Sequence, residues 1–497
     1  MQEFHHFVMV PSKRPDALKR FLQAYKEHIA QTGTPRNRVH FIVVNASQRH
    51  GYSQLKKELR EFLHENPEYQ EHVHFIQNQW KDEFMRELKK EGVPSSLRRF
   101  FQYANYSQLR NIGYLASLRL ARELRVNPQH VLLHQIDDDV LPHYSTQDDP
   151  RSTLPLHPEI SVFSTAEAMF SNPRIGAVLG NYVGQKDIQI PRALRLAMQD
   201  AQRSRHYNPL DPNDILKDPR RALEFYRGLQ GATTTETPET WIRTPTADDF
   251  TRTFTRSRFD GRPGGAMAFR LSRYGYVPPT RFRGEDHLHA RKLFAENPDA
   301  VQYAPKRLLY HDRYPQRDLL GESQSDFFSQ MIATFSHPSE LPDEQTLRKH
   351  IRQFAEVNYT ELFEAPWKEL QQAHHELTQR ITKIQEEGDG QKKLPVLKQV
   401  QTEQKKVIDN LNELKTYYEK LYEACHPGNS ESRPSQEVRN AVLEFNANAK
   451  KLEEHQQRIV RAALKIPIPK AIPKTGKKAR NRKRLSKKNQ IMKPQFP

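Results

Sequence analysis

The chain has almost no cysteine and no long apolar run. Only Cys425 occurs among its 497 residues, which excludes an intramolecular disulfide framework and a zinc site built from cysteines. Any bound metal must therefore be held by oxygen or imidazole groups. No stretch of 18 or more apolar residues occurs, and the first residues have neither a basic region nor a long apolar region, so a transmembrane or conventionally exported protein is not expected. We expect a cytoplasmic protein in a reducing compartment.

Positive charge is in excess, but it is unevenly distributed. Twelve Lys or Arg and no acidic residue occur from Lys465 onwards, so 18 − 12 leaves a net charge of +6 for the other 464 residues. Such a segment buries too little apolar area to fold alone, and residues 465–497 are predicted to form a disordered basic tail. It would attract any polyanion, such as nucleic acid or an anionic membrane, and it could also direct nuclear targeting. A purely solubilising end is the alternative.

Residues 1–335 alternate short apolar runs with helical patterns. This order predicts an α/β domain with a mainly parallel sheet, whose ligands would bind at the carboxyl ends of the strands. The expected strands cover residues 6–10, 39–44, 72–77, 131–136, 175–179 and 264–270, and the expected helices include residues 18–25, 111–124 and 166–171. Residues 186–260 are polar and have no strong period, so they form either an insertion that shapes an acceptor pocket or mobile surface.

The composition changes to Gln, Glu, Lys and Leu from about residue 342. Apolar residues then recur at heptad spacing, which predicts an a/d seam in residues 342–464. The seam residues are Val400, Val407, Leu411, Leu414, Tyr418, Leu421, Val438, Val442, Phe445, Leu452 and Ile459. Breaks at residues 388–390 and 427–434 divide the region into about three helices, arranged as an antiparallel bundle or a coiled-coil hairpin. We interpret it as a scaffold.

Three carboxylates, Asp137, Asp138 and Asp139, follow the apolar run VLLHQI directly. Adjacent carboxylates repel one another unless a cation or hydrogen-bond donors stabilise them. A solvated acidic turn is the simpler explanation for an acidic triplet on its own. The position after a buried strand favours a site for a divalent metal with oxygen ligands.

Weaker signals occur later in the domain. Glu285 and Asp286 stand at the start of a helical pattern, where the helix dipole alone explains them, although one could also act as a general base. The pair Gly264 and Gly265 permits a tight turn or a close approach to a ligand, and His311 could serve as an imidazole ligand. No P-loop, G-x-S-x-G elbow or H-E-x-x-H helix occurs, so those enzyme classes lose support.

Six segments, taken in order, resemble the GT-A fold glycosyltransferases, and most closely family 2 of the nucleotide-sugar transferases. They are similar to that family's opening strand and Pro-rich turn, second strand, Arg-Asn-x-Gly helix, Asp-x-Asp motif, Gly-Gly segment and Glu-Asp segment. The segments are VMVPSKRPDALKRFL at 8–22, FIVVNAS at 41–47, SQLRNIGYL at 107–115, IDDDV at 136–140, GGAMAFR at 264–270 and RGEDHLHARK at 283–292. The resemblance covers about residues 1–320 and implies a Rossmann-like GT-A domain.

The resemblance also implies roles for individual residues. A UDP- or GDP-sugar donor would lie at the carboxyl ends of the first strands, against Pro11, Ser12, Arg14, Asn45, Arg110, Asp137, Asp138, Gly264 and Gly265. Asp139, with Asp137 and His311, would hold Mn²⁺ or Mg²⁺. Asp286, or Glu285 beside it, would deprotonate an acceptor hydroxyl in an inverting transfer. Asn45 stands where the family usually has an acidic residue, so the contact to the base is altered.

The predicted function is therefore a metal-dependent glycosyltransferase (a hexosyltransferase-type enzyme) with an unidentified acceptor. The main alternative is a protein that binds nucleic acid or another polyanion through the tail and carries a degenerate α/β domain. A third hypothesis is a metal-dependent phosphoryl-transfer enzyme or nuclease that uses Asp137 and Asp139. Such sites usually gather more carboxylates than this sequence reveals.

Overall fold

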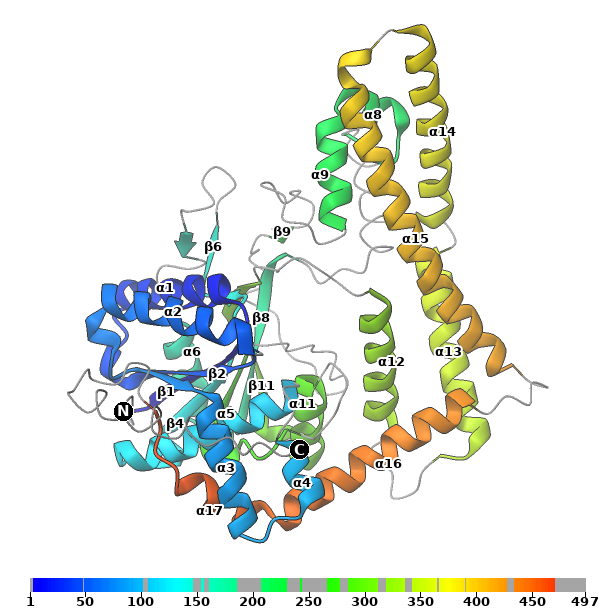
Figure 1. The fold of residues 1–497 in the computed structure, drawn as a ribbon. Helices are drawn as coiled ribbons and strands as arrows, with labels where there is room; N and C mark the ends of the chain where they lie inside the picture. Colours follow the sequence, from blue (N-terminus) through cyan, green and yellow to red (C-terminus); the bar gives the residue numbers. More distant parts are fainter. Residues whose placement is uncertain are drawn as a thin grey trace, which may run out of the picture.

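The computed structural model describes most of the chain. The described residues are 3–47, 49–101, 106–145, 153–155, 161–185, 207–229, 242–243, 266–277, 285–311, 319–335, 342–363, 366–388, 390–426 and 433–469. Figure 1 shows an α/β domain at the N-terminal end and a helical region that projects from it.

The α/β domain is built around a mixed sheet with nine strands among the described residues. Its strand order is β3-β2-β1-β4-β10-β8-β11-β5, with β9 paired to β8. The strands are β1 (His5–Ser12), β2 (Val39–Asn45), β3 (Val73–Ile76), β4 (Val131–Gln135), β5 (Val140–Leu141), β8 (Ala177–Gln185), β9 (Ile242–Arg243), β10 (Met267–Arg270) and β11 (Val301–His311). The first four strands pair in parallel, β11 pairs in parallel with β8, and β10 lies antiparallel between β4 and β8. The prediction of an α/β domain with a mainly parallel sheet is confirmed.

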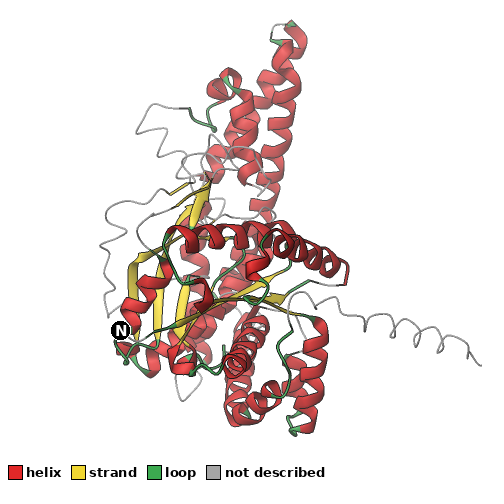
Figure 2. Ribbon diagram, turned by 90° about the vertical axis from the view of Figure 1, so that its left-hand side faces the viewer, coloured by secondary structure: helices red, strands yellow, loops and turns green. Residues whose placement is uncertain are grey.

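Helices cover both faces of this sheet (Figures 1 and 2). Helices α1 (Pro15–Gln31), α2 (Arg49–Glu65) and α6 (Val162–Phe170) cover one face, and α3 (Asn78–Lys90), α4 (Ser95–Phe100), α5 (Tyr106–Leu124) and α11 (Glu285–Glu296) cover the other. In β1, Val8 and Val10 point to the first face, while Phe7 and Met9 point to the second. This alternation, with apolar residues at successive positions, is the pattern of a strand buried on both faces.

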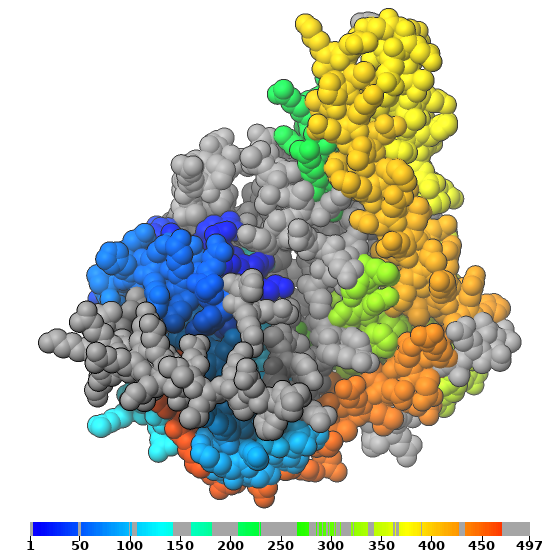
Figure 3. Space-filling model, viewed as in Figure 1, coloured from blue at the N-terminus to red at the C-terminus, as the bar shows by residue number. Residues whose placement is uncertain are grey.

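The helical region shares one apolar core. It contains α12 (Leu319–Phe335), α13 (Glu344–Phe363), α14 (Pro366–Glu387), α15 (Leu394–Ala424) and α16 (Arg433–Glu454). Helices α13 and α14 pack along α15, and Figure 3 shows this part standing away from the N-terminal domain. The prediction of a helical C-terminal region is confirmed. The expected number of about three helices from residue 342 is too low. From that residue on, the described part of the chain forms five α-helices, which are α13 to α16 and α17 (Gln456–Leu464).

The polar stretch at residues 186–260 contributes helices that the sequence analysis did not predict. Helices α8 (Pro212–Lys217) and α9 (Pro219–Leu229) lie within it, and α9 packs along α15. Tyr226 is fully buried there, and Gln404 of α15 donates to its hydroxyl at 3.0 Å. This part of the stretch therefore belongs to the core of the helical region.

The last described helix returns to the α/β domain. Helix α17 (Gln456–Leu464) packs against α3 and α5, and Ile466 and Ile468 beyond it are buried in the same core. The basic tail therefore does not begin at residue 465 as predicted, since residues 465–469 pack on the domain, and residues 470–497 lie outside the described part of the chain. Among the helices of the described ranges, none combines the length and apolarity needed to cross a bilayer.

Candidate active site

The acidic triplet lies on a tight turn at the carboxyl end of the central strand β4. The main chain of Ile136 still hydrogen bonds to Met9 of β1, at 3.1 Å, and the amide of Val140 donates to the carbonyl of Asp137 at 3.0 Å. The turn leads into β5, whose partner β11 aligns His311 with Val140. The backbone thus brings His311 next to the residue that follows Asp139. The His311 side chain is not among those described.

Asp138 is the buried member of the triplet, with 4% of its surface exposed. Ser12 Oγ, at the end of β1, donates to Asp138 Oδ2 at 2.6 Å. Arg14 binds the same carboxylate twice, through Nη2 to Oδ1 and through Nε to Oδ2 at 3.3 Å. Burial raises the pKa of Asp138 to about 6, and the charge of Asp139 adds to this, while the bonds from Arg14 and Ser12 oppose it. Asp138 is therefore an internal anchor of the turn.

Arg14 also reaches the third carboxylate. Its Nη2 lies 3.0 Å from Asp139 Oδ2, so one guanidinium group contacts two members of the triplet. Burial lowers the pKa of Arg14, but the bond to Asp138 and the charges of Asp139 and Asp138 outweigh this, and the pKa lies above its ordinary value. Arg14 remains charged at any pH at which the protein is folded.

Arg110 neutralises the first carboxylate from the other face of the sheet. It extends from α5 and is only 1% exposed, and its Nη2 donates to Asp137 Oδ1. Its Nε lies 3.8 Å from Glu285 Oε1 at the start of α11. The Glu285 side chain is itself 8% exposed, so the Arg110–Glu285 pair is buried. Through Arg110, the acidic turn and the N-terminus of α11 become parts of one charge cluster.

The next residues of α5 hold this helix in place. Asn111 is fully buried and binds Val277 twice, donating to its carbonyl at 3.0 Å and accepting from its amide at 2.8 Å. A Cβ at Gly113 would overlap the Met9 side chain and lie 3.3 Å from Val44 Cγ2. A larger residue here would therefore force the buried Met9 side chain or α5 itself to shift, so glycine permits the close approach of α5 to β1 and β2. In the Arg-Asn-x-Gly segment, Arg110 supplies a positive charge, Asn111 binds the backbone of Val277, and Gly113 permits the close contact with β1 and β2.

Asn45, at the end of β2, lies in a separate polar group. It is fully buried, its Nδ2 donates to Asn78 Oδ1 at 3.1 Å, and its Oδ1 accepts from the amide of Ser47 at 2.9 Å. Lys81 of α3 donates to the carbonyl of Asn45 at 2.6 Å, and burial lowers the pKa of Lys81 to about 8. Neither Asn78 nor Lys81 was predicted from the sequence, although both lie in the first residues of α3, just beyond the carboxyl end of β3, where ligand-binding groups are expected.

The remaining predicted residues are only partly described. Pro11 lies in β1, in register with Val44 of β2. Asp286 belongs to α11, but its side chain is not described, and Gly264 and Gly265 lie outside the described residues. The structure thus brings together Ser12, Arg14, Arg110, Glu285 and the acidic triplet.

The charge balance of this cluster favours a cation. Its described residues comprise four carboxylates and two guanidinium groups, an excess of two negative charges. Within the described part of the chain, no group of three or more His, Cys, Asp or Glu side chains is arranged to hold a metal ion. The protein ligands here suit an ion that takes one or two carboxylates and completes its coordination with substrate phosphates and water, as Mg²⁺ commonly does.

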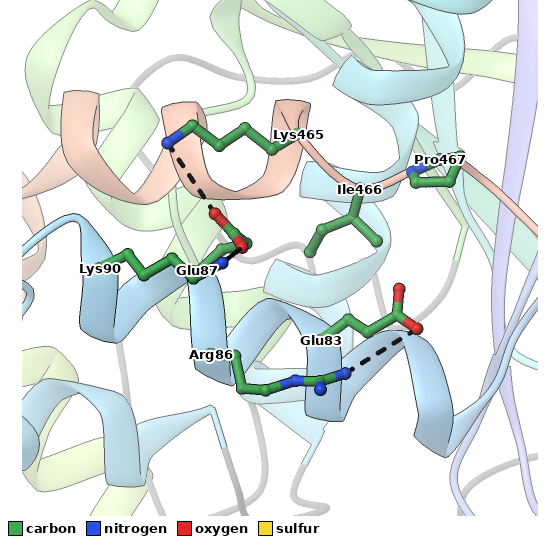
Figure 4. Close-up of a pocket in the computed structure, with 7 residues that line it drawn as sticks. All are labelled: Glu83, Arg86, Glu87, Lys90, Lys465, Ile466 and Pro467. Carbon is green, nitrogen blue, oxygen red and sulfur yellow. Dashed lines mark hydrogen bonds and ion pairs between the residues drawn. The ribbon is translucent and has the colours of Figure 1, made fainter.

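A pocket of about 180 Å³ lies elsewhere, between α3 and the segment that follows α17 (Figure 4). It is lined by Glu83, Arg86, Glu87, Lys90, Lys465, Ile466 and Pro467. Its charged side chains pair with one another, for example Lys465 with Glu87 at 3.8 Å and Arg86 with Glu83 at 4.0 Å. The Lys465–Glu87 pair joins the C-terminal segment to α3, whereas Arg86 and Glu83 both belong to α3. The pocket contains none of the predicted site residues.

No known family model matches this chain, and no curated protein matches it.

Proposed function

We propose that this protein is a metal-dependent glycosyltransferase that uses a nucleotide-sugar donor. The observation that carries the proposal is the convergence of four carboxylates and two arginines at the carboxyl end of β4. These groups come from Arg14 between β1 and α1, from α5, from the turn after β4 and from α11. A mainly parallel α/β sheet presents its ligand site at this edge.

The donor set fits Mn²⁺ or Mg²⁺. Asp139 and Asp137 offer hard oxygen ligands, with side chains 14% and 32% exposed, and the excess of two negative charges matches one divalent cation. His311, aligned with Val140, could add an imidazole. When bound, such a cation would neutralise the charge of a leaving diphosphate. The donor would be a UDP- or GDP-sugar.

We assign the remaining roles in the transfer to residues of the chain. Arg110, fixed by Asp137 and Glu285, presents a buried positive charge toward the donor. Because Glu285 is paired with Arg110, we assign to Asp286 the task of accepting the proton of the acceptor hydroxyl. Glu285 then acts as a positioning residue for Arg110. Attack by this hydroxyl on the side opposite the diphosphate gives an inverting transfer.

The first test combines nucleotide binding with turnover. A panel of UDP, GDP and their sugars, with and without Mn²⁺, should identify a donor that binds only with the metal. Asp139→Ala removes a proposed metal ligand and should abolish metal-dependent turnover. The variant should still fold, because the residue lies on a loop. The control Asp409→Ala, at an exposed site on α15, should have no effect. Full turnover in folded Asp139→Ala would refute the assignment.

The second test concerns the base. Asp286→Asn keeps the shape of the side chain and removes its basicity, so transfer should fall by about 10² to 10⁴ while donor affinity changes little. A collapse of donor affinity with normal transfer from bound donor would show that Asp286 binds the donor and that the base lies elsewhere.

The sequence of the tail supports a second, separate role in binding a polyanion. Eleven positive charges occur from Lys470 onwards, and the attraction of such a segment to nucleic acid or an anionic membrane depends on counterion release. Binding of the full chain to RNA or to anionic vesicles should weaken steeply between low and physiological salt. Binding that is insensitive to salt would argue against this role.

A further inference from the structure

Arg14 is a partly buried arginine that contacts two members of the acidic triplet. It directly precedes α1, where Pro15 begins the helix, and its guanidinium group lies over the acidic turn. It makes a two-pronged contact with Asp138 and reaches Asp139 Oδ2 at 3.0 Å. One positively charged group thus binds the buried carboxylate and the carboxylate that we assign to the metal.

A divalent cation and this guanidinium group would compete for Asp139. Both are positive, both need its oxygen atoms, and like charges at such short range disfavour each other. Each interaction therefore weakens the other unless Arg14 withdraws from Asp139. The Arg14 side chain is 24% exposed, whereas that of Asp138 is 5% exposed, so the arginine is the member of the pair with access to solvent.

We propose that Arg14 is an internal counter-ion that occupies the metal-binding carboxylate until the diphosphate of a donor draws the guanidinium group away. This inference rests on the proposed function. A planar guanidinium fork matches a phosphate as well as it matches a carboxylate, so the diphosphate offers Arg14 an equivalent partner. Asp138 keeps the hydrogen bond from Ser12 when Arg14 leaves, at 2.6 Å in this structure.

This exchange couples metal binding to nucleotide binding. In the free protein, Mn²⁺ must displace Arg14 without help, so its affinity is low. Once a nucleoside diphosphate holds Arg14, Asp139 is released to the metal. Because coupling between two ligands is reciprocal, Mn²⁺ must raise nucleotide affinity by the same factor. Removal of Arg14 should therefore raise Mn²⁺ affinity in the absence of nucleotide and reduce the coupling.

The test measures Mn²⁺ binding directly, by electron paramagnetic resonance of the free ion, with and without UDP or GDP. Arg14→Gln should bind Mn²⁺ at least about tenfold more tightly than wild type when no nucleotide is present, since one adjacent positive charge is removed. Added nucleotide should tighten Mn²⁺ binding strongly in wild type and only weakly in Arg14→Gln. Arg433→Gln removes an equal charge from an exposed site on α16 and should behave as wild type.

A double variant protects the test against misfolding and against a simple effect of net charge. Arg14→Gln/Asp138→Asn leaves no unpaired buried carboxylate and keeps the net charge of the site, so a gain in Mn²⁺ affinity would report the release of Asp139. If both folded variants bind Mn²⁺ no more tightly than wild type, while wild type binds it with nucleotide, the inference fails and the proposed function stands. If no protein binds Mn²⁺ with UDP or GDP, both fail.

Discussion

Removing one partner of the buried pair of Arg110 and Glu285 should strongly destabilise the α/β domain. Arg110 is 1% exposed and the Glu285 side chain 8% exposed, so Arg110→Met leaves a carboxylate buried without its charge partner. Breaking a buried ion pair from one side costs about 3 to 5 kcal/mol. Arg110→Met/Glu285→Gln removes both charges and should recover part of the loss, with a coupling energy of about 1 to 3 kcal/mol.

The measurement is a double-mutant cycle in urea. The chain has three tryptophans, and Trp80 lies buried in α3 of the α/β domain. Trp241→Phe and Trp367→Phe would leave Trp80 as the only tryptophan, so that tryptophan fluorescence reports on that domain. Lys57 and Glu61 form a matched control, because they are an i,i+4 pair on α2 with side chains 69% and 42% exposed. Their cycle should give only about 0.3 to 0.5 kcal/mol.

A coupling energy for Arg110 and Glu285 no larger than that of the control would refute the reasoning. It would mean that the 3.8 Å separation of Arg110 Nε and Glu285 Oε1 does not represent a working ion pair. Glu285 would then lose its assignment as the residue that positions Arg110. The general base could in that case be either Glu285 or Asp286.

Three further predictions concern packing, pH and chain length. Gly113→Ala should destabilise the protein by about 1 to 3 kcal/mol in urea, because its methyl group overlaps the fully buried side chain of Met9; unchanged stability would contradict the close packing of α5. Burial is the main reason that the pKa of His40 is lowered to about 2, and the charges of neighbouring histidines add to it. Below pH 6.5 the unfolded chain therefore binds a proton at His40 that the folded protein does not bind. Stability should therefore fall by about 2 kcal/mol per such histidine at pH 5, and His40→Phe should make the acid dependence shallower than in wild type. A chain that ends at residue 469 should keep the melting temperature of the full chain. One that ends at residue 460 loses the buried Ile466 and Ile468 and should be less stable by about 3 to 6 kcal/mol. Equal stability of the two truncated chains would show that residues 461–469 contribute nothing.

Strands β1, β2 and β4 were predictable because each is specified locally, whereas β5, β9 and β11 were not predicted. The runs at residues 6–10, 39–44 and 131–136 are apolar at nearly every position, and this pattern requires burial on both faces of a sheet. All three lie within β1, β2 and β4 or reach one residue past the strand end. The break predicted at residues 388–390 is likewise local, since Gly388 and Gly390 adopt φ values of 76° and 79°.

The heptad pattern predicted burial but not the burial partner. Val438, Val442 and Phe445 of α16 lie in the core of the helical region, whereas Leu452 and Ile459 lie in the core of the α/β domain. A heptad shows which face of a helix is apolar and says nothing about the element that covers it. The return of the chain to α3 and α5 depends on contacts across hundreds of residues, such as Arg119 Nη1 donating to the carbonyl of Leu464 at 2.6 Å.

The same limit applies to the site. The position of the acidic triplet after a buried strand identified it as a candidate, but its partner Arg14 lies 124 residues away from Asp138 and could not be assigned from spacing. Lys81 was missed because its lowered pKa is a property of burial, which a helical pattern of Lys and Glu does not reveal. Sequence therefore located the carboxylates, and the fold determined what neutralises them.

Helix α5 connects these observations. Successive residues of an α-helix point about 100° apart, so Arg110, Asn111 and Gly113 face different neighbours. Gly113 lets the helix approach Met9, Asn111 ties it to Val277 on the chain that leads toward α11, and Arg110 reaches Asp137 and Glu285. A change at Gly113 that lifts α5 from the sheet would therefore also displace Arg110 from both carboxylates. The packing requirement of a single glycine and the charge balance of the site are thus two consequences of the same helix position.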